Sequence, residues 1–428
     1  MPFNTHPLRQ RLNDEIHARP PVPLTAPTLV SFLAFIHDEA TPEADRTHID
    51  GLQARFGQAT AGPDDAAHRI IDGGDFLLKW ERHGEFSTYT FFRQTEGLPD
   101  LTATALAAAP AEWIEAIPGQ LITATHMDFL PADTPVAPLL AARFPSSETL
   151  VASQLAGQAA TVYTDFRIHE GFSRYVVLNG DLDRLRAGRT VQRLLEVETY
   201  RVMALLAFPT AKAVGRLLAR AENELADLID RMSHATNADD ERAVLADLTR
   251  LAAEVEHSVA STNYRFGAAA AYYRLVQQRV SELKEICISG YPNIKGFMER
   301  RLAPALNTCA AIARRQEDLS GRIARTSQLL RTRVDIELER QNQELLAQMN
   351  QRAKLQLRLQ ETVEGLSVVV LTYYGSQLVQ YLTKGTKELH HLNPDVITAV
   401  SIPLIAGLVA WGTHRMRRKL AAEEGEAH

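Results

Sequence analysis

The chain has 428 residues, of which 45% are hydrophobic and 23% are charged, as in ordinary folded proteins. This length exceeds what one small core can organise, so about two or three structural units are expected. The formal net charge of -6 argues against a general nucleic-acid-binding protein, which needs a basic face to neutralise phosphates.

The N-terminus and the cysteines indicate a reducing, cytosolic setting for most of the chain. The first residues contain no apolar core of the kind that a signal peptide requires. Cys287 and Cys309 are the two cysteines of the chain, and neither has the spacing of a metal ligand. Both fall within helical patterns, so small, buried, reduced thiols are expected.

Residues 1–27 are interpreted as an N-terminal arm that ends in a proline-rich connector at 19–23. That run is incompatible with a helix interior and predicts extended backbone. Glu15 and His17 in this arm could bind a metal or exchange a proton. Two residues apart on a helix, however, they point to different sides. Docking of the arm by hydrogen bonds and ion pairs is the favoured interpretation.

Residues 28–180 mix strand-like and helix-like patterns, which predicts a cytosolic α+β domain. The stretch 28–37 is a nearly continuous apolar run, as in a buried strand. The stretches 75–80 and 87–93 are aromatic and β-branched, and residues 82–85 between them suit a hairpin turn. Further strands are predicted at 121–129, 150–154, 160–167 and 172–178, and helices at 45–56 and 98–108.

Strand signals vanish after residue 180, and residues 181–364 predict long antiparallel helices that form a coiled-coil-like stalk. Asp181 is the expected N-cap of a first helix, which reaches about residue 232 with a bend at Pro209. Residues 237–240 are expected to form a turn, and 289–292 to end the second helix. In that helix apolar side chains recur three or four residues apart, as packing against another helix requires: Val255, Val259, Thr262, Phe266, Ala269, Tyr273, Val276, Val280 and Leu283.

Residues 295–364 predict one long helix, with Pro304 at a kink or in the first turn. Its apolar seam is thin, because Gln316, Ser320 and Ser327 interrupt it. A thin seam needs a partner. We therefore expect antiparallel packing against residues 240–287, or parallel packing against other copies in a homo-oligomer. The seam consists of Leu306, Ile323, Leu330, Val334 and Leu338.

Residues 365–413 contain two charge-free stretches, at about 366–383 and 395–412, which predict a C-terminal hairpin of two transmembrane helices. A buried hairpin of a soluble bundle is the alternative. A basic cluster follows the second stretch, at Arg415, Arg417, Arg418 and Lys419, so the positive-inside rule places the basic-then-acidic tail 414–428 in the cytosol. Two spans then place the N-terminal part there as well, and Trp411 suits the aromatic belt at the inner face.

The first of these stretches carries polar side chains at helical spacing. Polar groups in hydrocarbon are costly unless they are hydrogen-bonded or wetted. One interpretation is hydrogen bonding within the hairpin or an oligomer, and the other is a face that lines a water-filled path. This candidate pore or oligomer-interface face comprises Tyr373, Ser376, Gln377, Gln380 and Thr383.

The sequence contains no P-loop, dinucleotide-binding, metalloprotease, hydrolase or kinase signature, so no catalytic residue, resident metal or cofactor is assigned. His390 and His391, with Glu388 and Asp395, could attract a divalent cation. An ordinary solvated connector is the simpler interpretation.

Three phrases of the sequence resemble one bacterial family. They are the segment at residues 6–21, the segment at 195–209 and the segment at 355–369. The family consists of uncharacterised proteins that are expected to be membrane-anchored and that carry a domain of unknown function. The resemblance covers the whole chain, and it implies no activity and no catalytic residues.

The order of the predicted parts also resembles the architecture of CorA-type magnesium transporters. Those proteins have an N-terminal α/β part, a long stalk helix, two C-terminal spans and a basic tail, and they form rings with the first span at the pore. Their hallmark is Gly-Met-Asn at the outer end of the first span. The nearest string here, at residues 374–377, lacks the Met and the Asn and falls in the middle of the span.

Together these patterns predict a non-enzymatic, self-assembling scaffold or interaction protein of the bacterial inner membrane. It would have multiple spans, and both termini would lie in the cytosol. Its expected partners are the lipid bilayer and other copies of itself. The alternative is an ion-conducting or transporting homo-oligomer that uses the face around Gln377.

Overall fold

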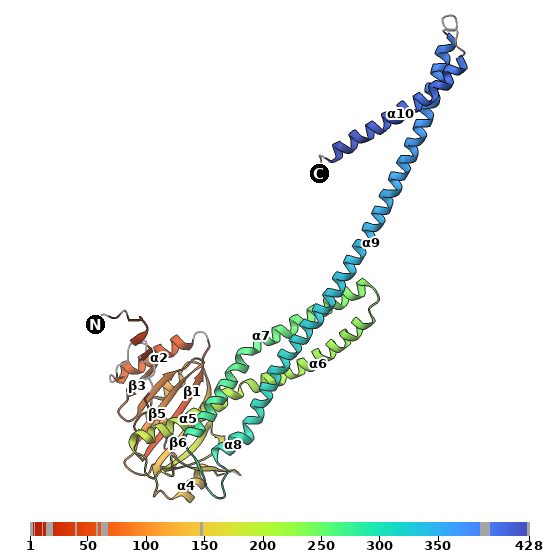
Figure 1. The fold of residues 1–428 in the computed structure, drawn as a ribbon. Coiled ribbons are helices and arrows are strands. Elements are labelled where there is room, and N and C mark those ends of the chain that lie inside the picture. The colour runs from red at the N-terminus through yellow and green to blue at the C-terminus, as the bar shows by residue number, and fades with distance from the viewer. Residues whose placement is uncertain are drawn as a thin grey trace. The chain divides into compact units, whose positions relative to one another are not determined.

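The computed structural model describes residues 3, 5–10, 12–13, 20–38, 41–56, 59–60, 67–145, 149–385 and 394–425 (Figure 1). The chain divides into two compact units. A sheet unit comprises Met1–His234 and Val244–Ser327, and a C-terminal unit comprises Ala235–Ala243 and Gln328–His428. The fold is of the α+β class, with the strands in the first unit and only helices described in the second.

One ten-stranded sheet organises the first unit. Its order is β10-β7-β8-β9-β6-β1-β5-β4-β3-β2, and every neighbouring pair is antiparallel except β6 and β9. The strands are β1 (Thr28–Ile36), β2 (Ala59–Thr60), β3 (His68–Asp72), β4 (Leu77–Arg82), β5 (Phe86–Gln94), β6 (Gln120–Pro131), β7 (Val151–Leu155), β8 (Ala160–His169), β9 (Phe172–Asn179) and β10 (Ile286–Cys287).

The seven predicted strands are all present. The continuous apolar run forms β1, which lies near the middle of the sheet and is buried on both faces. The predicted hairpin is formed by β4 and β5, with paired residues from Leu77↔Phe92 to Arg82↔Ser87. The short strands β2, β3 and β10 were not predicted. Cys287 lies in β10 and is exposed, so the expectation of a buried helical thiol is wrong there, whereas Cys309 is buried.

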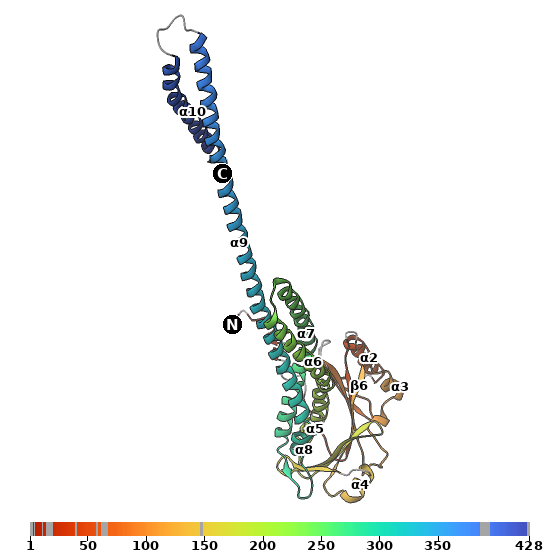
Figure 2. The same ribbon diagram turned by 90° about the vertical axis from the view of Figure 1, so that its right-hand side faces the viewer.

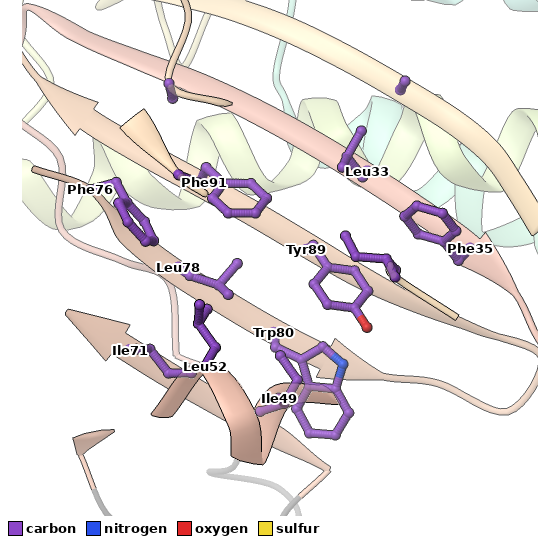
Figure 3. Packing of buried hydrophobic residues seen from close by; sticks show 14 of the residues in the cluster. Leu33, Phe35, Ile49, Leu52, Ile71, Phe76, Leu78, Trp80, Tyr89 and Phe91 are labelled. Atoms are coloured by element: carbon purple, nitrogen blue, oxygen red, sulfur yellow. The ribbon is translucent and has the colours of Figure 1, made fainter. Parts of the chain in front are cut away.

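The main apolar core covers one face of the sheet. Helix α2 (Thr41–Phe56) lays Ile49 and Leu52 against Leu78 and Trp80, and all four side chains are at most 1% exposed. Figure 3 shows Phe76, Phe91 and Tyr89 along the strands of the sheet, with Ile49 and Leu52 of α2 and the ring of Trp80 below them in that view. Burying an aliphatic side chain of this size contributes roughly 1.5–3 kcal/mol, so this cluster fixes the register of the sheet's middle strands.

The predicted helix at 98–108 is wrong. Only the short 3₁₀ helix η1 (Leu106–Ala108) forms there, and α3 (Ala111–Glu115) follows it. Pro99 and the β-branched Thr102 and Thr104 disfavour a regular helix before η1. The Ser31 hydroxyl accepts the Leu106 N–H at 3.1 Å, which ties this segment to the sheet.

Helix α5 (Arg184–Leu205) crosses the opposite face of the sheet, as Figure 2 shows. Its N-cap is Asp183, which accepts from the N–H groups of Leu185 and Arg186, and not Asp181 as predicted. Gly188 lets the extended N-terminal segment run against the helix, because an added Cβ would lie 1.8 Å from the Val22 carbonyl oxygen. Glycine is therefore required at this position.

The single bent helix predicted up to residue 232 is in fact two helices. Helix α5 ends at Leu205, and α6 (Ala207–His234) starts after a break at Leu206. Pro209 causes the break, because it has no N–H to donate to the Leu205 carbonyl and its ring crowds that group.

Three further helices follow α6 and lie wholly or partly in the sheet unit. They are α7 (Ala238–Glu282), α8 (Ile294–Arg301) and the start of α9 (Ala303–Gly385). Residues 237–240 are not a separate turn, since Asn237 accepts from the Asp240 N–H at 2.8 Å and so caps α7. Helix α7 ends at Glu282, before the predicted break at 289–292, and the chain then forms β10. Pro304 lies in the first turn of α9, as predicted.

The antiparallel packing of α9 against α7 is confirmed. The Gln316 side-chain N–H donates to the Ser258 hydroxyl at 2.9 Å, and Ser320 farther along α9 donates to Glu256 farther back on α7. Gln316 is only 2% exposed. It is therefore a hydrogen-bonded part of the interface and no gap in the apolar seam.

In the C-terminal unit, α9 continues from Gln328 to Gly385 and α10 spans Pro394–Gly425. Helix α9 passes through Gly365 without a break. The two helices touch at Gly375, where an added Cβ would lie 2.9 Å from the Ile405 side chain. Helix α10 also contains Pro403.

Candidate functional site

Two helical segments are long and apolar enough, by length and composition, to cross a membrane among the residues that the structure describes. One is Arg184–His234, which covers α5 and α6 and is one-third buried in its most apolar window. That segment packs on the sheet, so its apolar character is explained by the core. The other is Val396–Met416 in α10, of which none is buried.

The stretch 366–382, predicted as the first span, does not reach the same average hydropathy. It is free of charge, but its three tyrosines and two glutamines lower the average. Its apolar side chains nevertheless lie exposed on α9, and those of α10 do so as well. They include Leu366, Val369, Leu371, Leu378, Leu382, Val396, Val400, Leu404, Leu408 and Trp411, each more than half exposed.

The predicted pore or interface face lies along one stretch of α9. Tyr373 is 59% exposed, while Ser376, Gln377, Gln380 and Thr383 are half-buried. The Ser376 hydroxyl donates to the Tyr373 carbonyl at 2.8 Å, and the Thr383 hydroxyl donates to the Val379 carbonyl at 3.0 Å. These hydroxyl groups are thus satisfied by their own helix.

Of the residues expected to set orientation, two have described side chains. Trp411 is 60% exposed, and the Arg415 guanidinium lies 5.1 Å from the centre of its ring. The positions of Arg417, Arg418 and Lys419 fall within α10, and their side chains lie outside the description. The candidate metal residues Glu15, His17, Glu388, His390 and His391 also lie outside the described residues, as does the Asp395 side chain.

A polar cleft that the sequence did not reveal lies on the sheet face opposite α5. Its volume is about 810 Å³. Strand register places Ser31 of β1 beside His126 of β6, and His126 beside Arg174 of β9. Three residues from distant parts of the chain thus form one row across adjacent strands, which lie about 4.8 Å apart.

His126 is held in a defined state at the floor of this cleft. Its Nδ1 atom lies 2.9 Å from the Ser31 hydroxyl oxygen, and its ring stacks on Phe172 with 3.9 Å between ring centres. The Ser31 hydroxyl accepts the Leu106 N–H and completes its hydrogen bonding by donating to Nδ1, and on this ground we assign the proton of the neutral ring to Nε2. Burial, followed by the charges of Arg174 and Arg143, lowers the pKa of His126 to about 4. The ring is therefore neutral at pH 7.

A buried ion pair forms the next row of the cleft. Arg143, the last residue of α4 (Val136–Arg143), donates from Nε and Nη2 to the two oxygens of Asp128 at 2.6 and 3.0 Å. Both side chains are 8% exposed. Nη1 of Arg143 donates to the Leu101 carbonyl. This pair ties α4 and the 101–104 segment to β6, and so fixes two walls of the cleft. Burial raises the pKa of Asp128, and Arg143 opposes that rise.

Arg174 has fewer hydrogen-bond partners than Arg143, the other cation of the cleft. One of its Nη atoms donates to Glu170 at 2.9 Å, but Glu170 is 86% exposed. The Nε atom of Arg174 is buried and has no hydrogen-bond partner among the described residues. Nearby, His169 and the fully buried Asp165 side chain lie 2.7 Å apart at an irregularity in β8.

A smaller, more enclosed cavity of about 260 Å³ lies on the other face of the sheet, beneath α5. Lys79 and Glu81 of β4 form a buried ion pair there at 3.0 Å, and Arg279 of α7 bonds Glu196 of α5. Each charge has an opposite partner, which is the arrangement of a structural ion-pair network. Within the described ranges, no group of three or more His, Cys, Asp or Glu residues could hold a metal ion.

Only one local sign of the cleft is present in the sequence. His126 and Asp128 lie two apart on a predicted strand, and such residues share a face. Ser31 and Arg174 join them through strand pairing that no short-range pattern announces.

A family model described as "Protein of unknown function (DUF3422)" matches residues 4–420, which is nearly the whole chain. The predicted resemblance to a family of uncharacterised proteins is thereby confirmed, whereas the comparison gives no support to the likeness to CorA-type transporters. No curated protein matches the chain.

Proposed function

Because this chain belongs to the DUF3422 family, whose description carries no function, we propose from its structure that it is a membrane-anchored, self-assembling scaffold. In this proposal α10 and the end of α9 cross the bilayer as a hairpin. The sheet unit then stays in the cytosol as the part that meets other molecules.

The exposed apolar surface of α10 is the observation that carries this proposal. Its 21-residue segment Val396–Met416 contains no buried residue. At 1.5 Å per residue such a segment spans roughly 30 Å, which matches the hydrocarbon core of a bilayer. A surface of this kind is unfavourable in water and favourable in lipid. The close approach of α9 and α10 at Gly375 supports a hairpin, because small residues let membrane helices pack closely.

The direction of insertion follows from the charged tail. Arg415 lies next to Trp411, and three more basic residues follow within α10. The positive-inside rule then places this end of α10 in the cytosol, and two spans return the start of α9 to the same side. The inner membrane of a bacterium is the compartment that this proposal assigns.

Self-assembly is supported by the part of α9 between Gln328 and the apolar stretch. It exposes apolar side chains at helical spacing, including Leu355, Leu359 and Val363, each more than half exposed. Such a row is typical of a helix that packs against another. The face around Gln377 remains a prediction, as an interface or as a pore lining.

Fractionation of bacteria that express the full chain tests the anchor. The wild type should sediment with membranes and resist washing with high salt. A double variant, Leu404→Arg with Leu408→Arg, should leave the membrane fraction, since each arginine at the centre of a span costs about 2.5–3.5 kcal/mol. Leu345→Arg with Leu346→Arg is the matched control, because these leucines are equally exposed but lie outside the apolar segments. It should stay in the membrane.

A wild-type protein that remains soluble and monodisperse without detergent would refute the anchor. The mass of the protein purified in detergent tests self-assembly separately. A monomer at micromolar concentration would refute self-assembly without affecting the proposal that the protein is anchored in the membrane.

A further inference from the structure

We propose that the cleft between β1, β6 and β9 binds a small organic anion, a carboxylate with an apolar body, through Arg174 and His126. This site is independent of the membrane anchor, and it gives the sheet unit a specific ligand.

The size and the walls of the cleft suit a small molecule. Its volume of about 810 Å³ falls within the range of pockets that enclose such ligands. Apolar side chains from four different segments line it, among them Leu101, Ala142, Ile168 and Phe172. Ile168 is 74% exposed, although it lies beside a buried part of the sheet. An apolar body bound in the cleft would contact these side chains.

Arg174 determines the charge of the ligand. Its Nε–H is buried without an acceptor among the described residues, and a buried donor left in this state costs about 1–3 kcal/mol. Its ion pair with Glu170 does not compensate, because Glu170 is almost fully exposed and surface pairs contribute little. Arg174 lines the cleft and its side chain is 19% exposed, so its guanidinium can donate a charge-assisted hydrogen bond to a carboxylate placed there.

The neighbouring carboxylates already have cationic partners, and this disfavours a cation as the ligand. Asp128 has both oxygens bonded to Arg143, and the Glu170 carboxylate, which also lines the cleft, is paired with Arg174. Arg143 in turn donates a third hydrogen bond, to the Leu101 carbonyl, so this side chain is held in place as part of the wall and its charge is balanced by Asp128.

His126 contributes a neutral donor next to Arg174. With Nδ1 bonded to Ser31, its Nε2–H is the hydrogen that remains for a ligand. A neutral donor and a cation on adjacent strands provide two N–H groups for the two oxygens of one carboxylate. The stacking of Phe172 on the imidazole holds that donor in place.

Binding of benzoate to the full chain in detergent, measured by isothermal titration at pH 7, tests the proposal. Benzoate carries the carboxylate and an apolar ring, and benzamide is its uncharged analogue. We expect benzoate to bind at least tenfold more tightly than benzamide. Arg174→Gln should weaken benzoate binding at least tenfold, which is the loss of one charge-assisted hydrogen bond. Arg167→Gln is the matched control, because Arg167 is exposed on the adjacent strand β8. It should bind like the wild type.

Three results would overturn the proposal. The first is the absence of benzoate binding at millimolar concentration, and the second is equal affinity of the wild type and the Arg174→Gln variant for benzoate. The third is equal affinity of the wild type for inorganic phosphate and benzoate, which would show that the apolar body of the ligand contributes nothing. If Arg174→Gln does not fold, His126→Phe keeps the stacked ring and removes the Nε2–H. This variant should bind benzoate at least threefold more weakly than the wild type does, and its weaker binding of benzamide should be unchanged.

Discussion

The ion pair between Asp128 and Arg143 allows a sharp test of how the cleft is held together. Replacing Asp128 with asparagine leaves the Arg143 guanidinium buried with only the Leu101 carbonyl as a strong acceptor. Removing one partner of a buried pair typically costs about 3–5 kcal/mol, because the remaining charge is not compensated. Since both side chains are 8% exposed, we expect Asp128→Asn to lower the free energy of unfolding by an amount in that range.

Urea unfolding followed by tryptophan fluorescence measures this loss. The chain has three tryptophans, and a Trp411→Phe background leaves Trp80 and Trp113 as reporters, both in the sheet unit. With a slope of about 3 kcal/mol per molar urea, a loss of about 4 kcal/mol lowers the midpoint by more than 1 M, or about 1.3 M.

Glu170→Gln is the matched control for this variant. It also removes a carboxylate from an arginine in the same cleft, but Glu170 is 86% exposed. A surface pair of this kind contributes less than about 1 kcal/mol, so the midpoint should move little. If Asp128→Asn lowers the free energy of unfolding no more than Glu170→Gln does, burial is not the reason that the Asp128–Arg143 pair stabilises the fold.

Three further predictions concern the buried or crowded positions Asp45, Gly188 and Gly375. Burial raises the pKa of Asp45, so the folded chain binds the carboxyl proton more tightly than the unfolded chain. The free energy of unfolding should therefore fall as the pH rises from about 4 through the raised pKa. A pH series of urea melts should show this fall as a difference between the wild type and Asp45→Asn. Gly188→Ala should destabilise the fold by more than about 3 kcal/mol, whereas Gly267→Ala, with open space around its Cβ, should stabilise it by about 0.5–1 kcal/mol in the same melts. Gly375→Val should lower the temperature at which the protein aggregates in detergent, and Gly407→Val, which meets nothing within 4 Å, should not.

Seven of the ten strands were predictable because each of the seven carries its own local signal. The apolar run of β1 and the aromatic, β-branched runs of β4 and β5 are readable residue by residue. The two-residue strands β2 and β10 carry no such signal, since their existence depends only on the neighbours with which they pair.

The helices show where local patterns are insufficient. The seam of α7 was correctly recognised as a packing surface, and its antiparallel partner in α9 followed from it. The break at Leu206 and the N-cap at Asp183 differ from the prediction by a few residues, because hydrogen bonding at a helix end is decided by a single side chain. The polar Gln316 was interpreted as a weakness, and only the structure shows its hydrogen-bond partners.

The cleft could not have been found from the sequence. Its row of Ser31, His126 and Arg174 requires β6 to pair with β1 on one side and, in parallel, with β9 on the other. Only distant pairing brings these residues together. The residues of the predicted pore or interface face, in contrast, lie close in sequence and share helix α9, and their role remains a prediction.

Strand β10 determines when the sheet unit can finish folding during synthesis. Residues 286–287 complete the edge of a sheet whose other strands all precede residue 180. A ribosome must therefore make α5, α6 and α7 before the last backbone pairs with β7 can form. Such long-range closure is slow, because much chain must be ordered before the contact forms. A nascent chain released before residue 286 would keep the outer edge of β7 unpaired, which is the kind of edge that chaperones and aggregation both recognise.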